Sequence, residues 1–147
     1  MELTKLEALQ QKLFDKKILL KNITNNKLKA ACFKLEVKDS NDEDNHFAIF
    51  FDKEKLVTRT DEYVAILHET YHIEYNAFYT LDDSLQTRKR REYKANKAMI
   101  IDIIPIEQFK KALEYNLELW ELAKYFDVTE ETILLSFKIY KQMDLLP

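Results

Sequence analysis

The chain of 147 residues contains no glycine, and its only prolines are Pro105 and Pro147. Turns and helix ends that need a positive φ must therefore use other residues, of which Asn and Asp tolerate that conformation best. The segments "NITNNK" (22–27) and "DSNDEDN" (39–45) supply such residues. A glycine-rich phosphate loop of the Rossmann or Walker type is excluded, and most nucleotide-binding enzymes are excluded with it.

Composition indicates one globular domain that spans residues 1–147. Hydrophobic residues make up 46% of the chain and aromatic residues 12%, which argues against disorder. The net charge of −3 differs from that of a strongly basic DNA-binding protein, so any contact with nucleic acid would be local. The single cysteine, Cys32, excludes an internal disulfide and favours a cytoplasmic protein, in which it packs as a small buried hydrophobe. No apolar run approaches the roughly 18 residues of a membrane span.

Apolar spacing predicts an α+β fold that is mostly helical and has a small antiparallel sheet. The expected elements are a helix over 2–16, a hairpin of "LKAACFKLEV" (28–37) and "HFAIFF" (46–51), helices over 58–78 and from 83 or 84 to Pro105, and three helices within 106–116, 117–126 and 129–143. We find no repeat or linker that would divide the chain.

The acidic turn "KDSNDEDN" between the two hairpin strands could be mistaken for a calcium loop. It lacks the central glycine and the closing glutamate of such a loop, so we interpret it as a solvated turn. His46, at the head of the second strand, is expected to be structural rather than a metal ligand.

The segment "HETYH" falls in the middle of the helix expected from residue 58 and contains two of the three histidines. At about 100° per residue, His68 and His72 lie about 40° apart on one helical face, so both imidazoles can bind one metal ion. Glu69 flanks them, where a carboxylate can act as general base toward a metal-bound water. A helix with two histidines satisfied by hydrogen bonds is the plain alternative, and the spacing favours zinc.

A catalytic zinc ion has three protein ligands, and "REYKANKA" on the next predicted helix supplies the third. Glu92 follows His72 by twenty residues. Ala95 shares its helical face and is small enough to let the two helices approach closely. Asn96, one turn after Glu92, is expected to reach the free ring nitrogen of a histidine ligand. The sequence therefore predicts Zn²⁺ bound by His68, His72 and Glu92.

At these motifs, "ILHETYHIEYNAF" and "REYKANKA", the sequence resembles the ImmA/IrrE family of zinc metallopeptidases, which are small cytoplasmic proteins of phages and integrative elements. The likeness extends from about residue 46 to the C-terminus. It implies a gluzincin-like HExxH helix at the centre of the fold, with His68, His72 and Glu92 as ligands and Glu69 as base. It also implies a partner, because members of the family cleave or relieve helix-turn-helix repressors.

Two positions depart from the family pattern. Many members have HELGH, whereas Tyr71 replaces the glycine here. Helical phase turns Tyr71 about 60° away from His68, so it is expected to pack in the core rather than block the metal. Asn96 stands where gluzincins often have an aspartate. It can still accept a hydrogen bond but adds no charge to the imidazole.

We accordingly predict a zinc-dependent endopeptidase that cleaves or relieves a helix-turn-helix repressor, using zinc-activated water and Glu69 as general base. Tyr75, Tyr79 and Tyr93 are candidates for stabilising the oxyanion, and spacing does not choose among them. The alternative function is a non-catalytic, metalloprotease-like module that binds and inhibits a repressor without cutting it.

Two further segments invite a DNA-binding interpretation. "RKRR" (88–91) is expected to be a solvated basic face of its helix. "LAKYFDVTEETILLSFKIY" (122–140) is similar to a helix-turn-helix, but Glu130 and Glu131 open its second helix and apolar residues such as Ile133 fill it. A recognition helix should present basic or amide side chains to the groove. We therefore predict helix packing there and no direct DNA binding.

Overall fold

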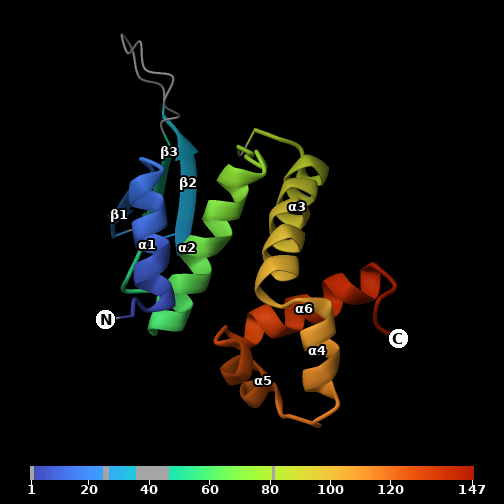
Figure 1. Cartoon of the computed structure of the whole chain (residues 1–147). Helices are drawn as coiled ribbons and strands as arrows, with labels where there is room; N and C mark the ends of the chain where they lie inside the picture. Colours follow the sequence, from blue (N-terminus) through green and yellow to red (C-terminus); the bar gives the residue numbers. More distant parts are fainter. Residues whose placement is uncertain (1, 25–26, 36–46, 81) are drawn as a thin grey trace. The chain divides into compact units, whose positions relative to one another are not determined.

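The computed structural model describes residues 2–24, 27–35, 47–80 and 82–147. In chain order its elements are α1 (Lys5–Asp15), β1 (Leu19–Asn22), β2 (Ala30–Lys34), β3 (Phe47–Phe51), α2 (Arg59–Glu74), α3 (Leu85–Ile103), α4 (Ile106–Leu113), α5 (Leu119–Phe126) and α6 (Glu130–Gln142). Within these described ranges the protein is mostly helical, with six helices and a small sheet of three strands, which confirms the α+β prediction (Figure 1). The acidic turn and His46 lie outside the described residues.

The chain divides into two compact units, Met1–Ala95 and Asn96–Pro147, and the boundary falls inside α3. The first unit contains the sheet, α1, α2 and the beginning of α3. The second contains the end of α3 together with α4, α5 and α6. The three predicted metal ligands and the predicted base all belong to the first unit. The single domain expected from composition stays a prediction.

The sheet has the strand order β1-β3-β2 and is mixed. β2 and β3 pair antiparallel, with Cys32 opposite Ile49, which confirms the predicted pairing of these two segments. β1 pairs parallel with the other side of β3, where Leu20 lies beside Ile49. The prediction of a purely antiparallel sheet is therefore wrong. β1 is a four-residue strand without alternation of buried and exposed residues, so its place depends on pairing with β3 and not on a local pattern.

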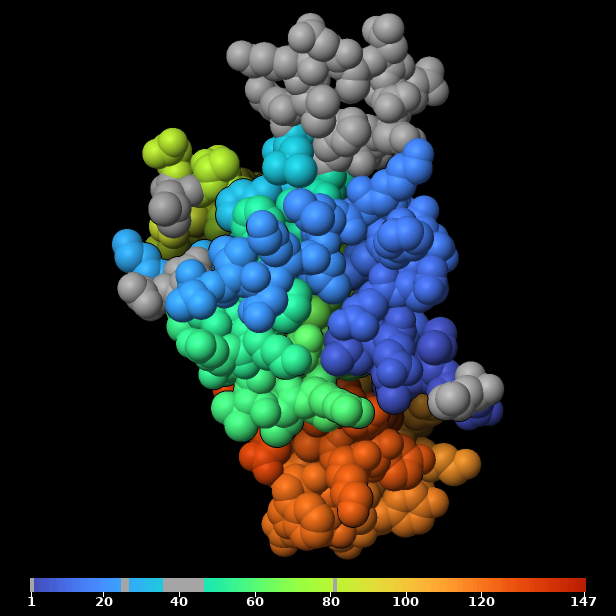
Figure 2. Space-filling view, turned by 90° about the vertical axis from the view of Figure 1, so that its left-hand side faces the viewer, coloured from blue at the N-terminus to red at the C-terminus, as the bar shows by residue number. Residues whose placement is uncertain are grey.

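The helices α1 and α2 contact each other, and both contact the sheet. Figure 1 shows α2 beside the sheet, and Figure 2 shows α1 and the segment after it on the outside of this unit. The core of the unit includes Leu13 of α1, Ile49 of the central strand and Ile66 of α2, none of which has exposed surface. This packing holds α2 against the sheet and so positions the histidines that it carries.

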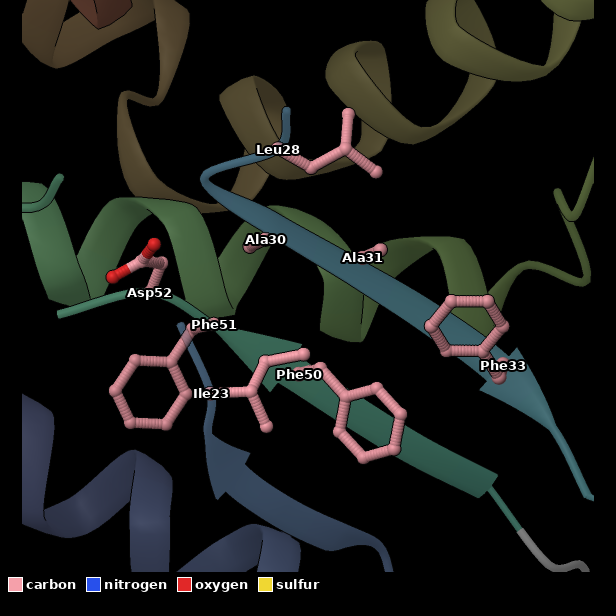
Figure 3. Close-up of a pocket in the computed structure, with 8 residues that line it drawn as sticks. All are labelled: Ile23, Leu28, Ala30, Ala31, Phe33, Phe50, Phe51 and Asp52. Carbon is pink, nitrogen blue, oxygen red and sulfur yellow. The ribbon is translucent and has the colours of Figure 1, made fainter. Parts of the chain in front are cut away.

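Ala31, Phe33 and Phe50 lie on the sheet face opposite to Cys32 and Ile49, because successive residues of a strand alternate between faces. The ring centroids of Phe33 and Phe50 are 5.4 Å apart. Together with neighbouring residues such as Ile23 and Leu28 they border a hollow of about 50 Å³ (Figure 3). Since one water molecule occupies about 30 Å³ of liquid, the hollow is too small for a peptide.

In the second unit Phe109 is fully buried and lies among other aromatic rings. Its ring centroid is 4.9 Å from that of Phe137 and 5.9 Å from that of Tyr140. The Tyr140 hydroxyl donates a hydrogen bond of 2.6 Å to the carbonyl of Ile104. Ile133 of α6 is also fully buried, in agreement with the predicted packing role of that helix. None of the described helices combines the length and the apolar character needed to cross a membrane.

Candidate metal centre

The helix α2 begins at a capping box and carries both histidines of "HETYH". The Thr58 side chain accepts a hydrogen bond of 3.0 Å from the Asp61 N–H, and the Asp61 carboxylate accepts one of 3.2 Å from the Thr58 N–H. These bonds satisfy donors that a helix start otherwise leaves free. Because the helix runs without interruption from Arg59 to Glu74, His68 and His72 lie one turn apart.

The end of α2 fixes the orientation of His72. Asn76 adopts the left-handed conformation, with φ of 49°, and lets the chain turn back so that the Ala77 N–H donates to the His72 carbonyl at 2.8 Å. The Ala77 carbonyl then accepts a hydrogen bond of 2.7 Å from His72 Nδ1. With Nδ1 used as a donor, the Nε2 atom of His72 is the one that faces the centre.

Positive φ occurs elsewhere in the described chain at Asn116, Asp127, Asp144 and Lys17. Asn and Asp therefore occupy most of these positions, as the absence of glycine predicts.

The helix α3 brings Glu92 against these two histidines. The Nε2 atoms of His68 and His72 are 3.0 Å apart. Glu92 Oε2 lies 3.0 Å from His68 Nε2, and Glu92 Oε1 lies 3.0 Å from His72 Nε2. His68, His72 and Glu92 thus form a group of side chains that could hold a metal ion, as the sequence predicts.

The donor atoms fit a tetrahedral metal ion such as zinc. Ligand atoms at about 2.0–2.1 Å from a tetrahedral ion are about 3.3 Å apart, close to the 3.0 Å separations of this group. Two imidazole nitrogens and one carboxylate oxygen also make a donor set that zinc accepts. Among the described residues no fourth Cys, His, Asp or Glu joins the group, so one coordination position is left for water or substrate.

The three ligands differ in accessibility. The side chain of His72 is 3% exposed, that of His68 is 21% exposed and that of Glu92 is 35% exposed. The centre is therefore anchored on its inner side by His72 and open to solvent on the side of His68 and Glu92. A site of this kind can admit a substrate, whereas a purely structural zinc site is closed.

Protonation at the centre is governed by the contact between Glu92 and the histidines. Burial raises the pKa of Glu92, but hydrogen bonds from His68, His72 and Tyr79 outweigh it and hold that pKa far below its usual value. Burial lowers the pKa of His72, but hydrogen bonds with Glu92 and Ala77 and the nearby carboxylate charges outweigh it and raise that pKa above 6.5. At a pH where His72 is protonated, a metal ion that binds here would have to displace that proton.

Glu69 lies beside the ligand group without belonging to it. Its charge raises the pKa of His72 and contributes to a raised pKa of Tyr79. The half-buried thiol of Cys32 on β2 is a neighbour of Glu69. Burial raises the pKa of that thiol well above its usual value, and the charge of Glu69 and its hydrogen bond with the thiol raise it further. Cys32 is therefore a neutral neighbour of the predicted base rather than a reactive thiol.

Of the three candidate tyrosines, Tyr79 is the one whose hydroxyl reaches the centre. It donates a hydrogen bond of 2.7 Å to Glu92 Oε1, and its ring lies edge-on to that of His72. Tyr75 stacks on Tyr71, with ring centroids 5.9 Å apart. Tyr71 is buried, which confirms that it packs in the core. The choice among tyrosines depends on the turn after α2, which sequence spacing does not determine.

One part of the centre is absent from the sequence prediction. The Ala77 carbonyl is a backbone group, so no side-chain pattern reveals it. The contact predicted between Asn96 and a histidine ligand stays a prediction.

Comparisons of the chain with models of protein families, with curated proteins and with solved structures found no match. The resemblance to the ImmA/IrrE family therefore rests on the motifs alone.

Proposed function

We propose that the protein is a zinc-dependent endopeptidase. The observation that carries the proposal is the convergence of His68, His72 and Glu92, whose donor atoms lie 3.0 Å from one another on a side that solvent reaches. Glu69 stands next to this group as a carboxylate that does not take part in it. Three protein ligands, an open position and an adjacent carboxylate are the parts that a hydrolytic zinc site requires.

A zinc ion held by these ligands would supply a Lewis acid that lowers the pKa of water and polarises a carbonyl group. Glu69 accepts the proton of the attacking water and passes it to the amine that leaves. The Tyr79 hydroxyl donates a hydrogen bond to the carbonyl oxygen of the scissile bond as negative charge develops on that oxygen. Ala77 keeps His72 in the tautomer and orientation that ligation needs.

The proposed substrate is a helix-turn-helix repressor of a phage or mobile element, which the protein cleaves or otherwise relieves. This part of the proposal is supported by the resemblance of "ILHETYHIEYNAF" and "REYKANKA" to the ImmA/IrrE family. It gives a reason for specificity as well, because a protease in the cytoplasm must recognise a folded partner to spare other proteins.

The test separates chemistry from binding by changing the base without touching the ligands. Glu69→Gln keeps the size of the side chain but removes the group that accepts the proton, so cleavage should fall by about 10²–10⁴-fold while zinc content is unchanged. Glu92→Ala should lose zinc as well as cleavage. Glu74→Gln is the matched control on the same helix, because Glu74 pairs with Lys12 and Lys16 and should leave cleavage intact.

The measurements are zinc content, cleavage of a helix-turn-helix repressor encoded beside this protein, and derepression in cells. If Glu69→Gln derepresses as well as the unaltered protein does, catalysis is not the activity. The protein would then be a module that binds and inhibits its partner.

A further inference from the structure

The sheet has an outer face that points away from α2. Successive residues of a strand alternate between faces, so Phe47 and Ile49 share one face of β3 while Ala48 and Phe50 share the other. On the first face Ile49 is fully buried, and the ring of Phe47 stacks on that of Phe78, which follows α2 in the chain. The helix α2 contacts both β2 and β3 and is seen behind β2 in Figure 3. The second face is therefore the outer one, on the opposite side of the sheet from the helix that carries both histidine ligands.

This outer face is apolar, whereas a sheet face that meets water usually carries polar side chains. Two neighbouring rows across the three strands make up its centre, namely Leu19, Ala48 and Phe33, and then Lys21, Phe50 and Ala31. Leu19 is 50% exposed and Phe33 is 46% exposed, and Leu28, just before β2, is 51% exposed. Large apolar side chains that gather on one exposed surface are typical of an interaction site.

The exposed charges beside these apolar side chains are positive. Lys21 lies in the second row and Lys29 directly follows Leu28, and both lysines are exposed. Among the described residues of the two rows and of the hollow, the one carboxylate is that of Asp52. It is 3% exposed and lies 3.6 Å from Lys55 Nζ. A partner that covers the outer face therefore meets ammonium groups, and negative charge on the partner would complement them.

The hollow in the outer face indicates the shape of that partner. It measures about 50 Å³, is bordered by Leu28, Phe33 and Phe50 among other residues, and has room for part of one side chain (Figure 3). In protein interfaces, an apolar anchor residue that fills a small pocket supplies much of the affinity. A flat lipid bilayer would leave such a hollow unfilled.

A second copy of this chain lacks the charge that the face requires. In a two-fold symmetric pair the same surface of each copy meets the other. The lysines of both copies would then share one interface, without an exposed carboxylate from the rows or the hollow to offset them. Charge complementarity thus favours a different, acidic protein segment over self-association.

We propose that the outer face, formed by Leu19, Lys21, Leu28, Phe33 and Phe50, docks a protein segment in which an apolar anchor residue stands beside acidic residues. The anchor residue enters the hollow, and the carboxylates pair with the exposed lysines. This inference goes beyond the proposed peptidase function and does not depend on zinc. A segment bound on the outer face leaves the metal centre accessible, because the two lie on opposite sides of the sheet.

The test begins with a selection of random peptides displayed on phage against the full-length protein. The enriched peptides should carry a Leu, Phe or Trp residue beside Asp or Glu. The affinity of a synthetic peptide of the enriched sequence is then measured by fluorescence anisotropy. Leu28→Ser and Lys21→Glu should each weaken its binding about tenfold or more, since one removes an apolar contact and the other reverses a charge.

The chain offers a matched control for each variant. Leu134 on α6 is 54% exposed, close to the value for Leu28, so Leu134→Ser removes an equally exposed leucine. Lys138→Glu reverses the charge of an exposed lysine on the same helix. Both controls should keep the affinity for the peptide. All four substitutions are at exposed positions, and thermal unfolding verifies that each variant is folded.

The inference is overturned if no peptide is enriched, if the enriched peptides lack acidic residues, or if Leu28→Ser and Lys21→Glu bind as tightly as the unaltered protein. Cosedimentation with vesicles of phosphatidylserine and phosphatidylcholine that both variants abolish would identify a membrane surface instead. A dimer in light scattering that both variants dissociate would identify a second copy instead.

One further variant separates this inference from the proposed function. Glu92→Ala, which should lose zinc, is expected to bind the peptide as tightly as the unaltered protein. Peptide binding that is retained without zinc would support the docking face even if the protein proves not to be a peptidase. Peptide binding that is lost in a folded Glu92→Ala variant would place the peptide at the metal centre and overturn the inference.

Discussion

Zinc affinity should rise as pH increases through the range in which His72 is protonated. Zinc ligates neutral imidazole, so the ion and the proton compete for His72. Hydrogen bonds to Glu92 and Ala77 and the neighbouring carboxylates raise the pKa of His72 above 6.5 in spite of its burial. Between pH 5.5 and 6.5 the ring therefore carries a proton that zinc must displace.

The displaced proton sets the size of the effect. One proton released on binding changes the dissociation constant about tenfold per pH unit, which is about 1.4 kcal/mol. The affinity measured at pH 6.5 should thus be higher than at pH 5.5 by up to about tenfold. At a zinc concentration well above the dissociation constant, the same free energy raises the unfolding temperature of a unit of this size by several degrees.

The same two pKa shifts predict how the stability of the metal-free protein depends on pH. The raised pKa of His72 contributes stability that is fully present below pH 6.5 and is lost as pH rises through the folded-state pKa. The lowered pKa of Glu92 contributes stability that is present above pH 4.5 and is lost as pH falls through its folded-state pKa. Both contributions are complete between these two values. The contribution of these two groups to the free energy of unfolding of the metal-free protein should therefore be greatest in that pH window.

The assay combines calorimetric zinc titration with thermal unfolding at pH 5.5, 6.0 and 6.5. His46→Gln is the control, since it removes the remaining histidine and should leave the pH dependence unchanged. A zinc affinity that is constant over this range, or higher at pH 5.5, would contradict the prediction. His72 would then not be a zinc ligand whose protonated form Glu92 stabilises.

Three further outcomes are expected. Tyr79→Phe should retain zinc but lower repressor cleavage by about 10²–10³-fold, because it removes one donor to the developing oxyanion; a variant as active as the unaltered protein in a gel assay would exclude this role. Ile66→Ala should lower the free energy of unfolding by about 2–5 kcal/mol in chemical denaturation, since Ile66 has no exposed surface. Asn76→Val should weaken zinc binding as well as stability, because a β-branched residue tolerates positive φ poorly and the Ala77 carbonyl would move away from His72. Unchanged zinc affinity in Asn76→Val would show that the Ala77 contact is dispensable.

The helices and the grouping of His68, His72 and Glu92 could be predicted because their signals are local. Thr58 and Asp61 form the capping box that starts α2, and the i, i+4 spacing of His68 and His72 fixes their common face once the helix exists. Glu92 could be found because a catalytic zinc site requires a third protein ligand and the next helix carries a carboxylate that can supply it. For each of these residues the pattern within one helix carries the information.

The parts that could not be predicted depend on contacts between distant segments. β1 forms because Leu19–Asn22 pairs with β3, which lies far along the chain, and four residues carry too weak a pattern to reveal it. The selection of Tyr79 over the other tyrosines depends on the turn after α2.

The side chains of the candidate metal centre are held in place by hydrogen bonds with one another and with their neighbours. His68, His72 and Glu92 are within hydrogen-bond distance of one another. The Ala77 carbonyl accepts a hydrogen bond from His72, and Glu92 also accepts one from the Tyr79 hydroxyl. Immobilising a flexible side chain on binding costs about 0.5–1.5 kcal/mol, and here folding has already ordered the ligands. Binding of zinc would then exchange a proton and internal hydrogen bonds for coordination. Competition with protons, rather than ordering of the ligands, should therefore determine when the centre is occupied.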